Sequence, residues 1–132
     1  MITRSDLRKT AREYLQSAEI LQTNRKYDVA IYLCGYAIEI ALKERICRTL
    51  KWPGYPATSS EFSNFRSFQT HNLEVLLDLS AIEDKVTMTL GGDWFTLAKW
   101  TPEQRYNPRG TKTVNDADTM IRITAKALGV IL

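Results

Sequence analysis

Two arginines around a tyrosine form the best candidate for an anion-binding site in this sequence. Arg105, Tyr106 and Arg109 lie in a polar segment, residues 101–110, whose two prolines indicate a loop. Guanidinium groups bind phosphates through paired hydrogen bonds, and an aromatic ring between them could stack a base. The alternative is a solvated loop in which Tyr106 packs against the rest of the protein.

Glu39 and Lys43 are a second group with chemical potential. Four residues apart on a helix, they share one face and can form an ion pair. Glu39 follows a run without any charge, and an unpaired carboxylate in such apolar surroundings would be costly. The structural interpretation is a half-buried ion pair that fixes helix packing. The functional interpretation is that Glu39, Lys43 and Tyr36 line a polar pocket facing Arg105 and Tyr106.

Apolar residues at three- and four-residue spacing predict two long helices at the start of the chain. The first is amphipathic and begins near Ser5, a candidate N-cap, and ends near Asn24. The second begins at Tyr27 or Asp28 and continues to Leu50. Its first half is apolar on nearly every face, which predicts burial on several sides or a dimer contact. Because the break between them is short, the two helices should be antiparallel.

Shorter elements are predicted beyond residue 50. Residues 51–69 indicate a long loop, in which Phe62, Phe65 and Phe68 recur as in a helical turn. Three further helices follow: Leu73–Leu79 with an irregular continuation over 81–90, Trp94–Trp100 with Phe95 and Leu97 as core candidates, and Val114–Leu128 ended by Gly129. The sequence therefore predicts one all-α domain, residues 1–132. It would be an antiparallel up-and-down bundle of four to five helices, two of them long.

Composition limits the function classes. The formal charge of +3 permits contact with a nucleotide or an acidic partner, but it lacks the dense basic stripe of a dedicated nucleic-acid binder. Cys34 and Cys47 lie too far apart on one helix to form a disulfide, and no paired-cysteine motif suggests zinc. We expect free buried thiols, no metal and no cofactor. With no secretory signal and no membrane-length apolar run, we expect a cytoplasmic protein without membrane contact.

Three segments, in order along the chain, resemble the HEPN superfamily. The first is Ala37-Ile38-Glu39-Ile40-Ala41-Leu42-Lys43, which is similar to the "A-x-E-x-x-L-K" core of the family's second helix. The second is His71-Asn72-Leu73 with Leu76 and Leu77, similar to the opening of the third helix. The third is Arg105-Tyr106-Asn107-Pro108, which resembles the "R-Y-P" motif before the last helix. Together they span essentially the whole chain.

The resemblance implies a helical bundle that is commonly dimeric and often acts beside a small nucleotidyltransferase. Some members are metal-independent ribonucleases, including toxins of toxin–antitoxin pairs, and others are catalytically silent binding domains. The ribonucleases carry an arginine followed four to six residues later by a histidine near the last helix. The histidine moves protons and the arginine stabilises the phosphorane.

That ribonuclease motif is broken at the expected place, because no histidine follows Arg105. The only histidine, His71, follows Arg66 at a permitted spacing, but it precedes the third helix. We expect His71 to start that helix and to hydrogen-bond locally.

Three hypotheses result. The first is a non-catalytic binding domain, a homodimer that engages a nucleotidyltransferase partner or a nucleotide or RNA phosphate through Arg105, Tyr106 and Arg109. The second is a ribonuclease toxin that uses Arg66 and His71, or Arg105 without a histidine. The third is a purely structural dimer subunit.

Overall fold

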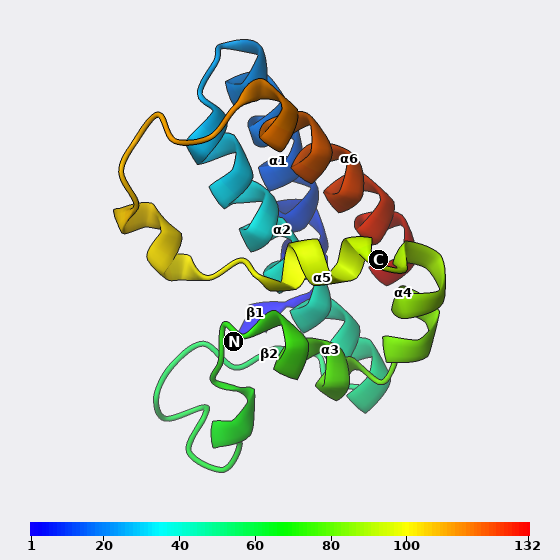
Figure 1. The fold of residues 1–132 in the computed structure, drawn as a ribbon. Helices are drawn as coiled ribbons and strands as arrows, with labels where there is room; N and C mark the ends of the chain where they lie inside the picture. The colour runs from blue at the N-terminus through cyan, green and yellow to red at the C-terminus, as the bar shows by residue number, and fades with distance from the viewer.

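The computed structural model describes residues 1–132 and confirms the all-α prediction. Three long helices form the bundle: α1 (Arg4–Thr23), α2 (Tyr27–Leu50) and α6 (Val114–Ile131). α1 and α2 form the predicted antiparallel hairpin (Figure 1). α6 runs antiparallel to α1 and in the same direction as α2, because the chain between α2 and α6 returns along the bundle before α6 begins (Figure 1).

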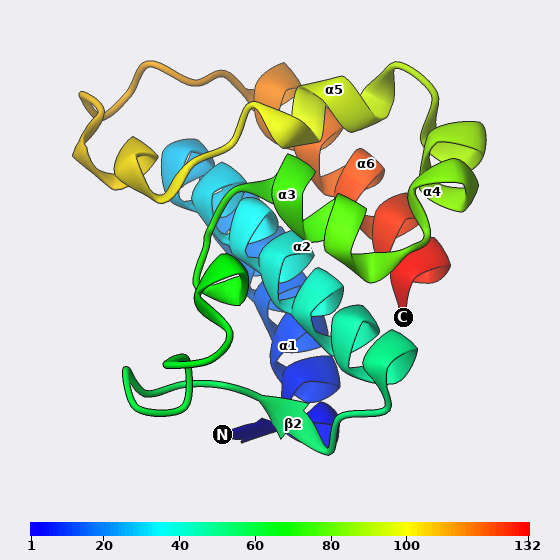
Figure 2. The ribbon, with the colours of Figure 1, turned by 90° about the horizontal axis from the view of Figure 1, so that it is seen from below.

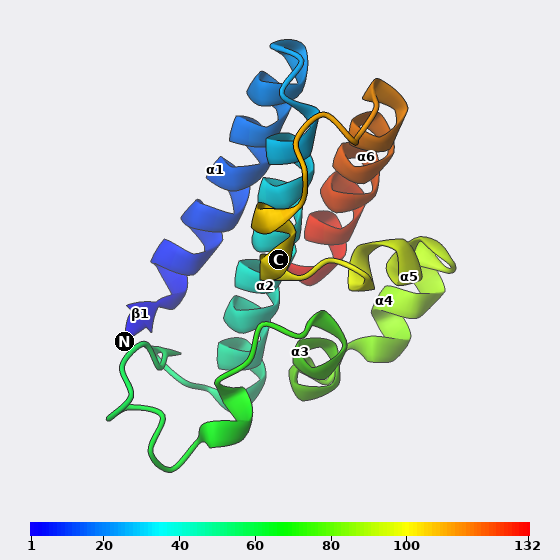
Figure 3. The ribbon, with the colours of Figure 1, turned by 60° about the vertical axis from the view of Figure 1, so that its left-hand side comes forward.

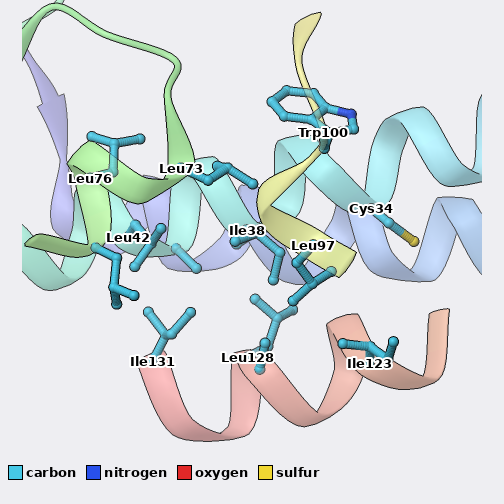
Figure 4. Close-up of a cluster of buried hydrophobic side chains, with 14 of the residues drawn as sticks. Cys34, Ile38, Leu42, Leu73, Leu76, Leu97, Trp100, Ile123, Leu128 and Ile131 are labelled. Atoms are coloured by element: carbon cyan, nitrogen blue, oxygen red, sulfur yellow. The ribbon is translucent and has the colours of Figure 1, made fainter. Parts of the chain in front are cut away.

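α2 is the central helix, which explains why its sequence is apolar on several faces. It packs against α1, α3 (Leu73–Ser80) and α6. Its buried side chains meet leucines and isoleucines from α3 and α6 and the residues Leu97 and Trp100 (Figure 4). The two cysteines of α2, Cys34 and Cys47, are buried and free as predicted. Burial raises the pKa of the Cys34 thiol to about 12 and that of Cys47 to about 11.

Two predicted helix ends were wrong. Thr3, not Ser5, is the N-cap of α1, and its hydroxyl accepts a hydrogen bond from the Asp6 amide. Gly129 does not end α6, which continues to Ile131. Ile131 is fully buried, and the burial of such a side chain outweighs the cost of about 1 kcal/mol for one helical glycine.

The segment between residues 73 and 98 forms three short helices, so the chain has six α-helices in all. α3 and α4 (Glu83–Leu90) are separated at Ala81, whose φ of +62° interrupts the helix at the predicted irregularity. α5 (Asp93–Ala98) buries Trp94 and Leu97, three residues apart on one face. Phe95 lies on the opposite face and is 63% exposed, so its prediction as a core residue was wrong.

The long segment after α2 folds over the beginning of α1. β1 (Ile2–Thr3) and β2 (Gly54–Tyr55) pair as two antiparallel two-residue strands. The predicted helical turn is the 3₁₀ helix η1 (Arg66–Phe68), where the Phe68 carbonyl accepts a hydrogen bond from the Tyr55 hydroxyl. This loop delivers residues 69–72 to the side of α2. No helix of the chain combines the length and the hydropathy needed to cross a membrane.

Candidate functional site

One face of α2 carries a row of polar and aromatic side chains. Successive helical residues are rotated by about 100°, so the row falls within an arc of about 80°. Its members are Asp28, Tyr32, Tyr36, Glu39 and Lys43. Two loops cross this side of the helix: the segment that begins at Trp100 near its start, and the segment around His71 further along (Figures 2 and 3).

Trp100 fixes the first of these loops against α2. Its indole Nε1 donates to the Tyr32 carbonyl at 3.1 Å, and its ring lies directly on Gly35. A Cβ added to Gly35 would stand 2.1 Å from that ring. The group that approaches Gly35 closely is therefore an indole ring and not another helix. The rings of Tyr32 and Tyr36 pack around the same indole, with centroids 6.1 and 5.0 Å away.

Asp28 fixes the far end of the same loop. One of its carboxylate oxygens accepts from the Gly110 amide and the other from the Lys112 amide. Gly110 has a φ of +80°, a conformation that favours glycine. The Asp28 carboxylate therefore binds the backbone of residues 110–112 and does not form an ion pair with the neighbouring basic side chains.

A pocket of about 180 Å³ lies between α2 and this loop. Three cationic side chains and a single carboxylate, that of Asp28, line it. The cations are Arg105, Arg109 and Lys112, and none of them forms an ion pair within 4.0 Å. A second hollow beyond Asp28 shares Arg109 and Lys112 and adds Arg25 and Lys26. The pocket thus presents unneutralised positive charge, which favours an anion.

Arg105 and Tyr106 lie together at the rim, in the 3₁₀ helix η2 (Pro102–Tyr106). The guanidinium carbon is 4.7 Å from the centroid of the Tyr106 ring. The neighbouring Tyr106 and Tyr32 side chains raise the pKa of Arg105 further above its usual range, and the guanidinium is a cation in any case. Tyr106 is 75% exposed, so the bundle does not cover it as the alternative interpretation required.

Glu39 organises the second cluster on the same face of α2. It is only 3% exposed, and Lys43 Nζ lies 3.1 Å from its Oε2 as the helical spacing predicted. His71 Nδ1 lies 2.7 Å from Oε1 of the same carboxylate. The expectation that His71 bonds locally was therefore wrong. Asn72 caps α3 instead, through a bond from the Val75 amide, which leaves the His71 ring free to reach across to α2.

Tyr36 lies between the two clusters. A hydrogen bond with Tyr32 raises the pKa of Tyr36 to about 12, with smaller contributions from burial and from the charge of Glu39. The Tyr36 ring packs edge-on against that of Tyr32, which lines the anion pocket, and Glu39 follows Tyr36 by about one helical turn. In place of the single pocket of the functional interpretation, the structure has two clusters with Tyr36 between them. Glu39 and Lys43 lie beside His71, and Arg105 and Arg109 line the anion pocket.

Several contributors were not found from the sequence. Asp28 was identified only as a possible first residue of the second helix, and Tyr32 and Lys112 were not singled out. The repeat of Asp28, Tyr32 and Tyr36 at four-residue spacing was the available signal. Arg66, which the ribonuclease hypothesis pairs with His71, is exposed in η1 and makes none of the ion pairs of the protein. No group of three or more histidine, cysteine, aspartate or glutamate side chains converges to hold a metal.

Comparison with known proteins gives one match. The family model described as "HEPN domain" matches residues 5–131, almost the whole chain. No curated protein matches, and no solved structure matches.

Proposed function

Because this chain belongs to the HEPN domain family, we propose that it is a non-catalytic binding module that holds the phosphate of a nucleotide between α2 and the η2 loop. The family includes ribonucleases and domains associated with nucleotidyltransferases. The binding role is favoured because the segment that resembles the family's catalytic motif has Arg105 but no histidine after it.

The observation that carries the proposal is the unpaired positive charge of the pocket. Arg105, Arg109 and Lys112 face a common space, and the one carboxylate there is occupied by two backbone amides. Charge-assisted hydrogen bonds from guanidinium groups to phosphate are among the strongest in proteins. Three cations held by a fixed loop would therefore bind a phosphate with little reorganisation.

The size of the pocket indicates which part of a nucleotide enters. Pockets that enclose a drug-sized ligand measure about 300–1,000 Å³, and this one measures about 180 Å³. One or two phosphates fit such a space, whereas the base would remain outside. Tyr106, exposed at the rim beside Arg105, offers a ring on which that base can stack.

The test is calorimetric titration of AMP, ADP and pyrophosphate into the wild type, Arg105→Ala and Arg109→Ala at low and high salt. A charged hydrogen bond contributes about 1.5–3 kcal/mol, so each substitution should weaken binding at least tenfold, and salt should weaken wild-type binding. Arg12→Ala, which removes the same charge from an exposed position on α1, is the matched control. Equal binding by Arg12→Ala and Arg105→Ala would refute the proposal.

The same proposal includes a homodimer that pairs with a nucleotidyltransferase. Its support is membership of a family in which dimers and such partners are common. Sedimentation over a range of concentrations tests the dimer, and co-purification with nucleotidyltransferases encoded beside the gene tests the partner. A dimer that binds neither nucleotide nor enzyme would instead be the purely structural subunit.

A ribonuclease is the second candidate function, and one contact favours it. The buried carboxylate of Glu39 holds His71 Nδ1, while the side chain of His71 is 60% exposed and its Nε2 has no hydrogen-bond partner. An oriented imidazole with one free nitrogen is what general acid–base catalysis requires. RNA cleavage in chelator, lost in His71→Ala or Arg105→Ala, would establish this function in place of the first.

A further inference from the structure

We infer that the polar face of α2 is one continuous site for a single-stranded oligonucleotide, and that the Glu39–His71 cluster is its second contact point. The inference rests on the proposed function, because it takes the anion pocket as the first contact point. It adds a ligand longer than one nucleotide and a direction along the helix.

The two contact points lie on the same side of the molecule. Arg105 lines the anion pocket together with Tyr32 of α2, and His71 reaches α2 at Glu39. The loops that carry these two residues cross α2 on the same side of the helix, as two views at right angles to each other show (Figures 2 and 3). A strand lying along this face could therefore touch both loops without passing around the helix.

The separation of the contact points suits a short strand. Tyr32 and Glu39 are seven residues apart, which is about 10 Å along a helix that rises about 1.5 Å per residue. Stacked nucleotides are spaced by about 3.4 Å along one strand, so this distance corresponds to about three nucleotides. A mononucleotide in the pocket cannot reach His71, whereas a trinucleotide or tetranucleotide can.

Tyr36 supplies the middle of the site. Its ring is partly exposed, lies between the two clusters, and packs edge-on against Tyr14 of α1 at 6.3 Å. Its hydroxyl is protonated at physiological pH, as that of any ordinary tyrosine is, and the contact with Tyr32 raises its pKa further, to about 12. A neutral aromatic ring between two polar contact points is the usual arrangement for bases of a single strand.

The exposure of His71 is the feature that a purely structural role leaves unexplained. The charge of Glu39 is already balanced by Lys43, which is 3.1 Å away and mostly buried. His71 adds a third group to this pair, with its side chain 60% exposed. With Nδ1 directed at the carboxylate, Nε2 is the ring atom left for a ligand, either for a phosphate oxygen or for a ribose hydroxyl.

The experiment measures affinity against strand length. Fluorescence anisotropy competition is run with 5′-phosphorylated ribonucleotides and deoxyribonucleotides of one, two, three, four and six residues. For the wild type, we expect affinity to rise at least tenfold between one and four nucleotides and then to level off. In His71→Ala, the affinity for the tetranucleotide should fall close to that for the mononucleotide.

Matched variants separate this inference from the proposed function. Gln69→Ala changes an exposed neighbour in the same segment and should retain the rise with length. His71→Gln, which keeps an amide donor toward Glu39, guards against loss of the fold in His71→Ala. Preference for the ribose series, lost in both His71 variants, would assign the ribose hydroxyl as the ligand of Nε2. Equal affinity for both series would assign the phosphate.

Each remaining outcome has a defined meaning. Affinity that does not change with length, while Arg105→Ala still weakens mononucleotide binding, overturns the oligonucleotide site and leaves the proposed function intact. A rise with length that persists in both His71 variants also overturns it. Absence of binding at every length overturns both proposals. Equal binding of a polyglutamate peptide, with the same dependence on His71, would show a general polyanion surface and reject the nucleotide specificity.

Discussion

At the scale of single residues, Gly35 and Asp28 determine the shape of the pocket although neither contributes positive charge. Gly35 permits the Trp100 indole to lie on α2, and that contact fixes where the η2 segment begins. Asp28 fixes where it ends. The positions of Arg105 and Arg109, which lie between these two anchored ends of the loop, therefore depend on both contacts.

Gly35→Ala tests the first of these contacts. Its Cβ would stand 2.1 Å from the Trp100 ring, so we expect overpacking to lower the free energy of unfolding by about 1–3 kcal/mol. Gly129→Ala is the matched control, because this glycine lies in α6 with nothing within 4 Å of the added atom. Removing a helical glycine there should stabilise the protein by up to about 1 kcal/mol. Urea unfolding measures both, and equal effects of the two substitutions would contradict the assignment.

At the scale of elements, the η2 loop is held by its backbone, so its anchor and its charge can be separated. Asp28→Ala removes a negative charge from the pocket, which by electrostatics alone would strengthen anion binding. It also frees the amides of Gly110 and Lys112. The loop would then lose its preorganisation, a general source of affinity.

We therefore expect Asp28→Ala to weaken nucleotide binding several-fold in the same calorimetric titration. Asp118→Ala removes a carboxylate that pairs with Gln22 at the exposed junction of α1 and α6, and it serves as the control. Tighter binding by Asp28→Ala would mean that charge, and not loop geometry, governs the site.

The elements also show what the sequence could predict. The spacing of apolar residues predicted the ends of α1, α2 and α6 to within a few residues. It could do so because the side of a helix that packs against the core is visible in the local sequence as a pattern of apolar residues. Local sequence could not give the contact between Glu39 and His71, which are 32 residues apart and meet only after the long loop has folded over α2. The role of Asp28 could not be predicted for the same reason, because its hydrogen-bond partners lie 82 and 84 residues later in the chain.

At the scale of the whole molecule, one buried carboxylate joins three helices. Glu44 of α2 is fully buried, and Arg4 of α1 donates to its Oε1 at 3.1 Å. Arg8 and Arg48 lie 3.7 and 3.6 Å from Oε2. Arg48 also donates to the carbonyls of Ile131 and Leu132 at the end of α6.

Glu44→Gln should therefore destabilise the entire bundle, because it leaves three arginines without their common counter-ion. Removing one partner of a buried ion pair typically costs about 3–5 kcal/mol. The arginines here are about one-third exposed, so water can partly compensate and we expect a loss of roughly 2–3 kcal/mol. Chemical denaturation measures this loss, with Glu13→Gln on the exposed face of α1 as the control. A loss below about 0.5 kcal/mol would show that the network is dispensable.

The placement of α6 has a consequence for the order in which the molecule assembles. α1 and α2 are joined by a short turn, so their hairpin needs only local contacts, which form quickly. α6 is separated from α2 by roughly sixty residues, so bringing the two together costs more loop-closure entropy than closing the short turn between α1 and α2. The anion pocket is built from α2 and the segment just before α6. We expect it to appear last during folding and to disappear first during unfolding, while the α1–α2 hairpin is still helical.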